Sequence, residues 1–238
     1  MTTDLRMRMG ALILAGVSAL GASCGLISSD VTDFNLDLPD KRFTIDTMSW
    51  NVNQQMAMDA LNVPCSSSMQ CMTAADMVCQ MDCSGTCTAQ SRCQINLDVG
   101  LHTSINLLTE KPELQQINDK AVIEVEIDDV FYTVEMNTLN VATPEIGVYV
   151  APMSVMDPMD PLAKKIGTIP AVAAGVTTPQ AQKMMFTADG RANLTATMGN
   201  FKTPFNVIVG STLSMTAGQP IPQGRLDAVI KIRAHAGL

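Results

Sequence analysis

Much of the chain alternates apolar and polar residues with a period of two, the pattern of a β-strand that buries one face. Such stretches lie at residues 34–38, 43–45, 95–107, 123–127, 130–136, 146–150, 164–170, 206–216 and 225–234. In the last of them, every second residue from Leu226 to Ala234 is apolar. The strands do not alternate with helices as in a βαβ protein, so a parallel sheet is not expected. The pattern predicts a mainly β fold, an antiparallel β-sandwich, with a closed β-barrel as the alternative.

A few short helices are expected beside the strands. Asn51, with Gln54 three residues later, predicts a capped helix over residues 51–61. Pro112 suits the first turn of a second helix, over residues 112–118. A third helix is expected over residues 178–186, ending before Asp189 and Gly190.

Six cysteines lie within one segment, residues 65–93, with the spacing C-x5-C-x7-C-x3-C-x3-C-x5-C. They are Cys65, Cys71, Cys79, Cys83, Cys87 and Cys93. The segment has few large aliphatic residues, so we expect a small insertion that disulfide bonds stabilise in place of a core. Thr73, followed by Asp76, predicts a capped helical turn that ends at Cys79. The segment contains no histidine and no C-x2-C pair, which argues against zinc, and the spacing leaves all fifteen disulfide pairings open.

The first 23 residues have the parts of a secretory signal peptide. Arg6 and Arg8 give a positive start, residues 9–20 form an uncharged apolar run, and residues 21–23 are small. A run of that length is shorter than the roughly 20 residues that span a bilayer. We therefore expect residues 1–23 to be a signal peptide, residues 24–30 a tether, and residues 31–238 one β domain that carries the insertion.

The junction Gly-Ala-Ser-Cys at residues 21–24 resembles the lipobox of bacterial lipoproteins, in which the cysteine is acylated and becomes the first residue. Ala22 and Ser23 fit that pattern, whereas Gly21 replaces the Leu that the family prefers. The resemblance implies a lipid on Cys24, and Gly25 implies sorting to the outer membrane, facing either the periplasm or the cell surface. Ordinary cleavage near Ala22 is the alternative. Once Cys24 is set aside, an even number of cysteines remains, which suits a closed disulfide set in an exported protein.

Composition and charge exclude several functions. The 238 residues are 4% aromatic and 16% charged, with a formal net charge of −8, which argues against a nucleic-acid partner. The sequence contains neither a G-x-S-x-G nor an H-E-x-x-H motif. The only two histidines, His102 and His235, lie in alternating stretches where exposed strand positions explain them. We therefore expect no enzymatic activity.

Methionine is unusually frequent, with 18 residues. Met153, Met156 and Met159 have the spacing M-x2-M-x2-M and resemble Met-rich motifs of periplasmic copper-handling proteins. Thioethers are soft ligands that suit Cu(I). Methionine also fills irregular gaps in a core and forms adaptable contact surfaces. We expect no cofactor, with a Cu(I) site at these three residues as the alternative.

These features predict a membrane-anchored lipoprotein with a structural, adhesive or partner-binding role at the cell envelope. The residues expected to meet a protein partner are the insertion, residues 65–93, and the loop at residues 152–161, because loops on a rigid scaffold carry most binding. A second possibility is a carrier that holds a lipid or another apolar ligand between its sheets. Such a carrier needs an apolar cavity of roughly several hundred Å³.

Overall fold

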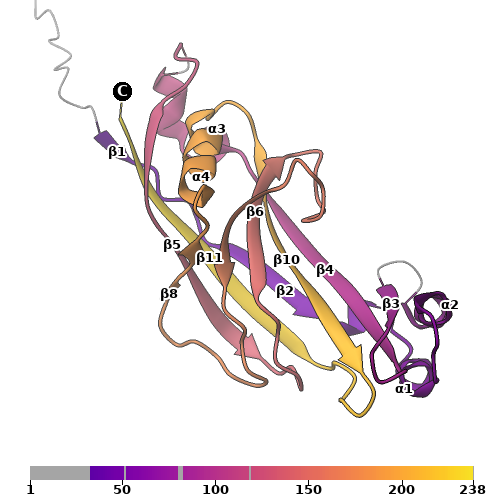
Figure 1. Ribbon diagram of the computed structural model, residues 1–238. Coiled ribbons are helices and arrows are strands. Elements are labelled where there is room, and N and C mark those ends of the chain that lie inside the picture. Colours follow the sequence, from indigo (N-terminus) through magenta and orange to yellow (C-terminus); the bar gives the residue numbers. More distant parts are fainter. Residues whose placement is uncertain (1–32, 51, 80–82, 118, 238) are drawn as a thin grey trace, which may run out of the picture. The chain divides into compact units, whose positions relative to one another are not determined.

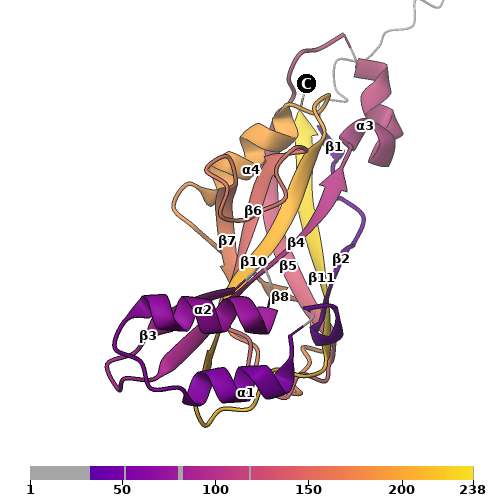
Figure 2. The ribbon, with the colours of Figure 1, turned by 90° about the vertical axis from the view of Figure 1, so that its right-hand side faces the viewer.

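A computed structural model describes residues 33–237, except residues 51, 80–82 and 118 (Figure 1). The expected signal peptide, the tether and Cys24 lie outside the described residues. The described residues belong to one compact unit, Thr32–Leu238. Their strands form two antiparallel sheets, and short helices lie near both ends of the strands (Figures 1 and 2).

The first sheet is built around its C-terminal strand. Its members are β1 (Asp33–Asn35), β2 (Lys41–Asp46), β5 (Glu124–Asn137), β8 (Gln182–Lys183) and β11 (Arg225–Gly237). β5 pairs with one side of β11, while β1 and β2 follow one another along the other side. A register shift beside Arg233 places Asp128 in a bulge, so that the residues from 124 to 137 form a single bulged strand.

The second sheet has the strand order β3-β4-β10-β6-β7-β9, with every neighbouring pair antiparallel. Its members are β3 (Cys83–Cys87), β4 (Cys93–Ile105), β6 (Ile146–Pro152), β7 (Lys164–Ile169), β9 (Met185–Phe186) and β10 (Phe205–Thr216). β4 and β10 pair without a register shift from Gln94 to Ile105. The described strands thus confirm the predicted sandwich, because they form two separate sheets in place of one closed barrel.

The main core lies between the two sheets and follows the alternation in the sequence. From β11 it contains Leu226, Ile230, Ile232 and Ala234, as the alternation predicts, and from the second sheet it contains Val148, Val150, Val207 and Val209. All eight side chains are buried. Burying a side chain of the size of Val or Leu contributes about 1.5 to 3 kcal/mol. Core formation therefore fixes which face of each strand points inward.

The helices differ from the expected ones. The first, α1 (Gln54–Asn62), begins later than predicted because Asn53 is its cap, accepting a hydrogen bond from the backbone N–H of Met56 at 3.0 Å. Asn51 lies outside the described residues. The helix expected at 112–118 is a short α3 (Leu107–Glu110) followed by a 3₁₀ helix, η2 (Pro112–Ile117).

The prediction of a helix over residues 178–186 is wrong. These residues lie along the sheet edges and contribute β8 and β9, and the N–H of Met184 donates to the carbonyl of Val130 at 2.8 Å. Pairing with the sheet outweighs the local helix signal. The helix is α4 (Gly190–Gly199), which begins where the sequence suggested an end, and it buries Leu194 and Met198 in the main core.

Candidate functional site

The six cysteines brace a small cap, made of α1, α2 (Ser68–Cys79) and β3, near one end of the strands (Figure 2). The bonds are Cys65–Cys87, Cys71–Cys93 and Cys79–Cys83. The predicted disulfide set is therefore confirmed, and the structure selects one of the fifteen pairings. Cys71–Cys93 joins α2 to β4, so the cap is covalently tied to the second sheet. Bonded sulfurs are no longer the thiolates that a zinc site needs.

The cap has a core of its own, contrary to expectation. Alanines from α1 and α2 pack against Ile95 and Leu97 of β4. The backbones of β3 and α2 also approach closely, since a Cβ on Gly85 of β3 would lie 2.0 Å from the carbonyl oxygen of Cys71 in α2. Small side chains are therefore enough to fill the space within the cap. The prediction that Thr73 is the N-cap residue of a helical turn is also wrong. Thr73 lies inside α2, where its hydroxyl donates to the Met69 carbonyl at 3.2 Å.

The loop between β6 and β7, residues 153–163, folds over the outer face of the second sheet. Asn206 of β10, which is 0% exposed, holds it there by donating to the carbonyls of Met153 at 3.1 Å and Val155 at 2.8 Å. The side-chain oxygen of Asn206, Oδ1, in turn accepts a hydrogen bond from the Ser104 hydroxyl at 2.7 Å. A buried amide with these partners fixes the position of the loop.

Two glycines make room for the same loop. Gly100 of β4 and Gly210 of β10 are register partners, and Pro158 lies over both. A Cβ on Gly210 would lie 2.4 Å from Pro158 Cγ. The loop also contains two short turns, in which Asp157 accepts from the N–H of Met159 and Asp160 from that of Leu162, each at 2.8 Å.

The three methionines of the predicted Cu(I) motif lie on this loop and point outward. Met153, Met156 and Met159 are 46%, 56% and 74% exposed. They follow a wider partition, since 11 of the 14 methionines in the described chain are exposed, whereas among its Leu, Ile and Phe residues only Leu162 is. Methionine here covers the surface, and the branched aliphatic residues fill the core.

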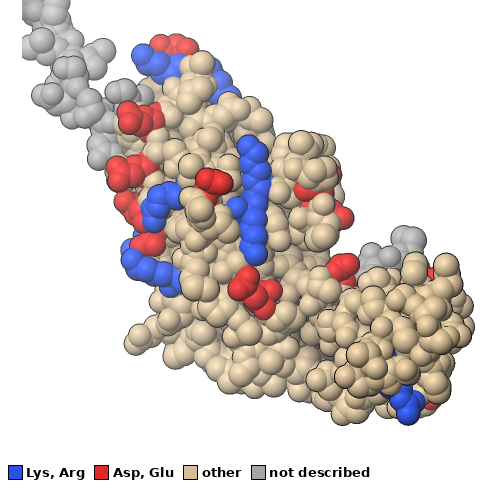
Figure 3. All heavy atoms as spheres, in the orientation of Figure 1, with Lys and Arg blue, Asp and Glu red and all other residues tan. Residues whose placement is uncertain are grey.

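A hollow of about 770 Å³ lies beside the loop and the cap. Residues 97–101 of β4 line it together with Gly147, Tyr149 and residues 156–159, and Ser49, Trp50 and Cys79 line it from the side of the cap. Its charged groups are Asp98, Glu145, Asp157 and Lys165. The two segments predicted to contact a partner therefore meet at one hollow. On the face shown in Figure 3, the cap carries few charged side chains.

An apolar pocket between the two sheets is much smaller than this hollow. It measures about 40 Å³ and is lined by apolar groups that include Ile45, Trp50 and Val99. This volume holds a few water molecules at most. It is well below the several hundred Å³ that a lipid carrier needs.

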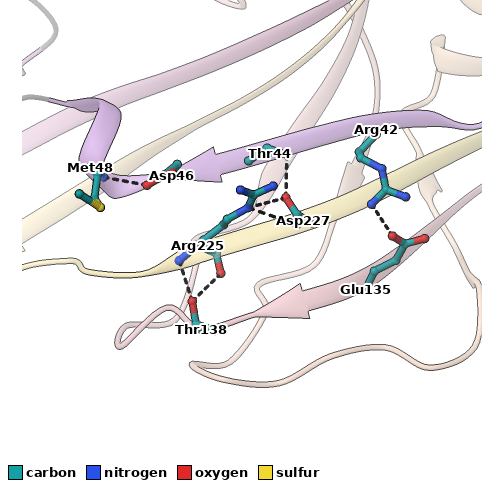
Figure 4. A network of polar contacts seen from close by, with 8 residues as sticks. All are labelled: Arg42, Thr44, Asp46, Met48, Glu135, Thr138, Arg225 and Asp227. Carbon is teal, nitrogen blue, oxygen red and sulfur yellow. Dashed lines mark hydrogen bonds and ion pairs between the residues drawn. The ribbon is translucent and has the colours of Figure 1, made fainter.

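Polar contacts on the outer face of the first sheet hold β2 against β11 (Figure 4). Asp227 accepts hydrogen bonds from the Thr44 hydroxyl at 2.6 Å and from Arg225 Nε at 3.0 Å. The Thr44 hydrogen bond, and next the charge and hydrogen bond of Arg225, hold the pKa of Asp227 below its ordinary value. Arg42 of β2 pairs with Glu135 of β5 across the same face. This cluster joins three strands, and its residues do not line the hollow.

The two histidines lie in different sheets, His102 on β4 and His235 on β11. His102 is exposed, and His235 is half-buried beside two carboxylates, with Nε2 3.2 Å from Glu126 and Nδ1 3.1 Å from Asp128.

No protein-family model and no curated protein matches the chain. Among solved structures, a chain from a full particle of Israeli acute paralysis virus, heated to 63 degrees, aligns over 99% of this chain and 86% of that chain. The two share 8% sequence identity with a TM-score of 0.27, a likeness too low to support an argument about fold or function. Within the described residues, no helix has the length and apolar character needed to cross a membrane.

Proposed function

We propose that the chain is a non-enzymatic exported lipoprotein that is anchored through Cys24 and binds a protein partner in the hollow beside the cap. The observation that supports this best is the convergence of two segments far apart in sequence. Cys79 of the cap and Met156 of the β6–β7 loop line the same hollow, although four strands, β3 to β6, lie between them in the sequence.

Bonds and close contacts within the chain hold both walls of the hollow in place. Three disulfides brace the cap, and Asn206 and Pro158 fix the loop. A preorganised site loses less conformational entropy on binding than a flexible one. Exposed thioethers at Met156 and Met159 provide polarizable contacts that adapt to the surface of a partner.

The proposed location follows from the leader and the cysteines together. Three disulfides in one small cap suit an oxidising compartment outside the cytosol. Acyl chains on Cys24 would hold the protein at a leaflet, since each buried CH₂ contributes about 0.8 kcal/mol and more than one chain gives stable anchoring.

Site-specific photo-crosslinking of the full chain in a Gram-negative host tests the binding site. p-Benzoylphenylalanine is placed either at position 156 or, as a matched control, at position 185. Met156 and Met185 are 56% and 53% exposed, but only Met156 lines the hollow. We expect a discrete protein adduct from position 156 alone. Equal adducts from both positions, or none from position 156, would contradict the assignment.

The anchor is tested by a separate experiment. Membrane-fraction protein should yield an N-terminal peptide that begins at Cys24 and carries the mass of acyl chains. The Cys24→Ala variant should leave the membrane fraction. Retention of Met1 in the mature protein would refute the lipoprotein assignment but would leave the hollow as a binding site.

A further inference from the structure

Among the residues that the structure describes, the second sheet has one long open edge, on β4. On that side β3 pairs with β4 from Cys93 to Leu97 and then stops. From Asp98 to Ser104 the structure gives β4 a partner only on its β10 side, within the residues it describes. These seven residues extend over about 24 Å at 3.4 Å per residue.

The other long strands at sheet borders are guarded, as is usual in natural sheets. The border of β5 is covered where Met184 and Thr178 donate to the carbonyls of Val130 and Val134, at 2.8 and 3.0 Å. At the outer border of β7, β9 pairs with it and Thr187 N–H donates to Ile166 at 3.0 Å. β2 is six residues long and begins with Lys41 and Arg42.

Among the described residues, no strand, helix or loop forms a backbone hydrogen bond with this stretch of β4 from its open side. It contains neither proline nor lysine, and its register with β10 has no bulge. Asp98, Gly100, His102 and Ser104 are all exposed. An unguarded edge of this length is a ready template for another extended chain.

The hydrogen bonds next to β3 show which backbone groups point to the open side. The N–H of Thr88 donates to the carbonyl of Arg92 at 2.9 Å, so even-numbered residues of β4 direct their backbone groups toward β3. Because alternate residues point the same way along a regular strand, the N–H and C=O groups of Asp98, Gly100, His102 and Ser104 face the open edge. They provide four donors and four acceptors in a row.

We propose that the partner adds an extended strand to β4 along Asp98–Ser104, which deepens the proposed function and rests on it. The hollow begins at this edge, because residues 97–101 line it in succession. An added strand would direct alternate side chains toward the half-buried Val99 and Leu101 and the others toward the exposed face of Gly100 and His102. The partner segment is therefore a stretch of about seven residues with apolar side chains at every second position.

Phage-displayed random octapeptides, selected on the full chain purified in detergent, provide the probe. The affinity of one selected octapeptide is then measured by fluorescence anisotropy. Copies that are N-methylated at single positions test the hydrogen bonds directly. Loss of one backbone donor that bonds to β4 should weaken binding about tenfold, and methylation of the intervening residues should change it less than twofold.

Two variants of one residue test the edge itself. His102→Pro removes a donor that faces the open side and leaves the β10 pairing in place, whereas His102→Ala keeps the donor. We expect His102→Pro to weaken peptide binding at least tenfold and His102→Ala less than twofold. Circular dichroism checks that both variants fold; if His102→Pro does not, the N-methyl series decides alone.

The outcomes separate this proposal from the proposed function. Failure to enrich any octapeptide, or an even response to N-methylation, would overturn strand addition. A crosslink from position 156 together with either result would keep the hollow as a binding site and show that its partner is recognised through side chains. Loss of that crosslink, with peptide binding along β4 intact, would overturn the hollow as the partner site.

Discussion

Disulfides that span different lengths of chain should contribute unequally to the stability of the cap. Cys71–Cys93 joins residues 22 apart in sequence, and Cys79–Cys83 joins residues 4 apart. A bond stabilises the fold by restricting the unfolded chain, and the effect grows with the logarithm of the loop it closes. A 22-residue loop corresponds to about 3.4 kcal/mol at 25 °C, and a 4-residue loop to about 1.9 kcal/mol.

The other disulfides lower the stabilisation expected from Cys71–Cys93. With Cys65–Cys87 in place, the shortest path between Cys71 and Cys93 runs through that bond and covers about 12 residues. The expected loss for the Cys71→Ala, Cys93→Ala double variant is then about 2.8 kcal/mol. For the Cys79→Ala, Cys83→Ala variant it stays at about 1.9 kcal/mol.

Urea unfolding under non-reducing conditions measures both losses. Trp50, the only tryptophan in the chain, packs against the core of the cap, so its fluorescence reports unfolding there. We expect the long-loop variant to lose about 1 kcal/mol more than the short-loop variant, the difference between the two loop terms. Equal losses, or a larger loss on removal of Cys79–Cys83, would refute the loop-length reasoning.

Three further substitutions test other contacts. Gly85→Ala should lower the free energy of unfolding in urea by about 1 to 3 kcal/mol, because its Cβ overlaps the backbone of α2; exposed Ser84→Ala is the control, and equal effects would contradict this. Asp227→Asn should cost about 1 to 2 kcal/mol at pH 7. Because the pKa of Asp227 is lower in the folded than in the unfolded chain, its ionised carboxylate stabilises the fold above about pH 4, where the carboxyl of the unfolded chain ionises. This contribution is lost as the pH falls through the pKa of the folded state. The difference from the wild type should therefore shrink between pH 7 and pH 3, and a constant difference would count against this origin. Asn206→Leu should leave two loop carbonyls without a donor and speed proteolysis within residues 153–163; unchanged cleavage would show that Pro158 alone holds the loop.

The sequence predicts the sandwich well because strand alternation records burial directly. The apolar face from Leu226 to Ala234 is the face that meets the core, and the structure has a strand within every stretch that the pattern predicts to be one. The helix at 178–186 failed because its residues bond to β5, a strand more than 40 positions earlier in the chain. Pairings of that range leave no local signal.

The candidate site was visible in the sequence only in part. The cysteine insertion and the methionine loop could be named, but their meeting at one hollow depends on the order of strands in the sheet. Gly100 and Gly210, each isolated in an apolar strand, were a usable sign of close approach by another segment. Asn206, a single amide in the buried start of β10, was another.

The placement of methionine at the surface gives the molecule a particular response to oxidants. Peroxides convert a thioether to a polar sulfoxide, a change that dedicated reductases reverse. Among the described residues, they would reach the 11 exposed methionines before buried Met184, Met198 and Met215. Oxidation would thus change the polarity of the outer surface while the interior between the sheets keeps its packing.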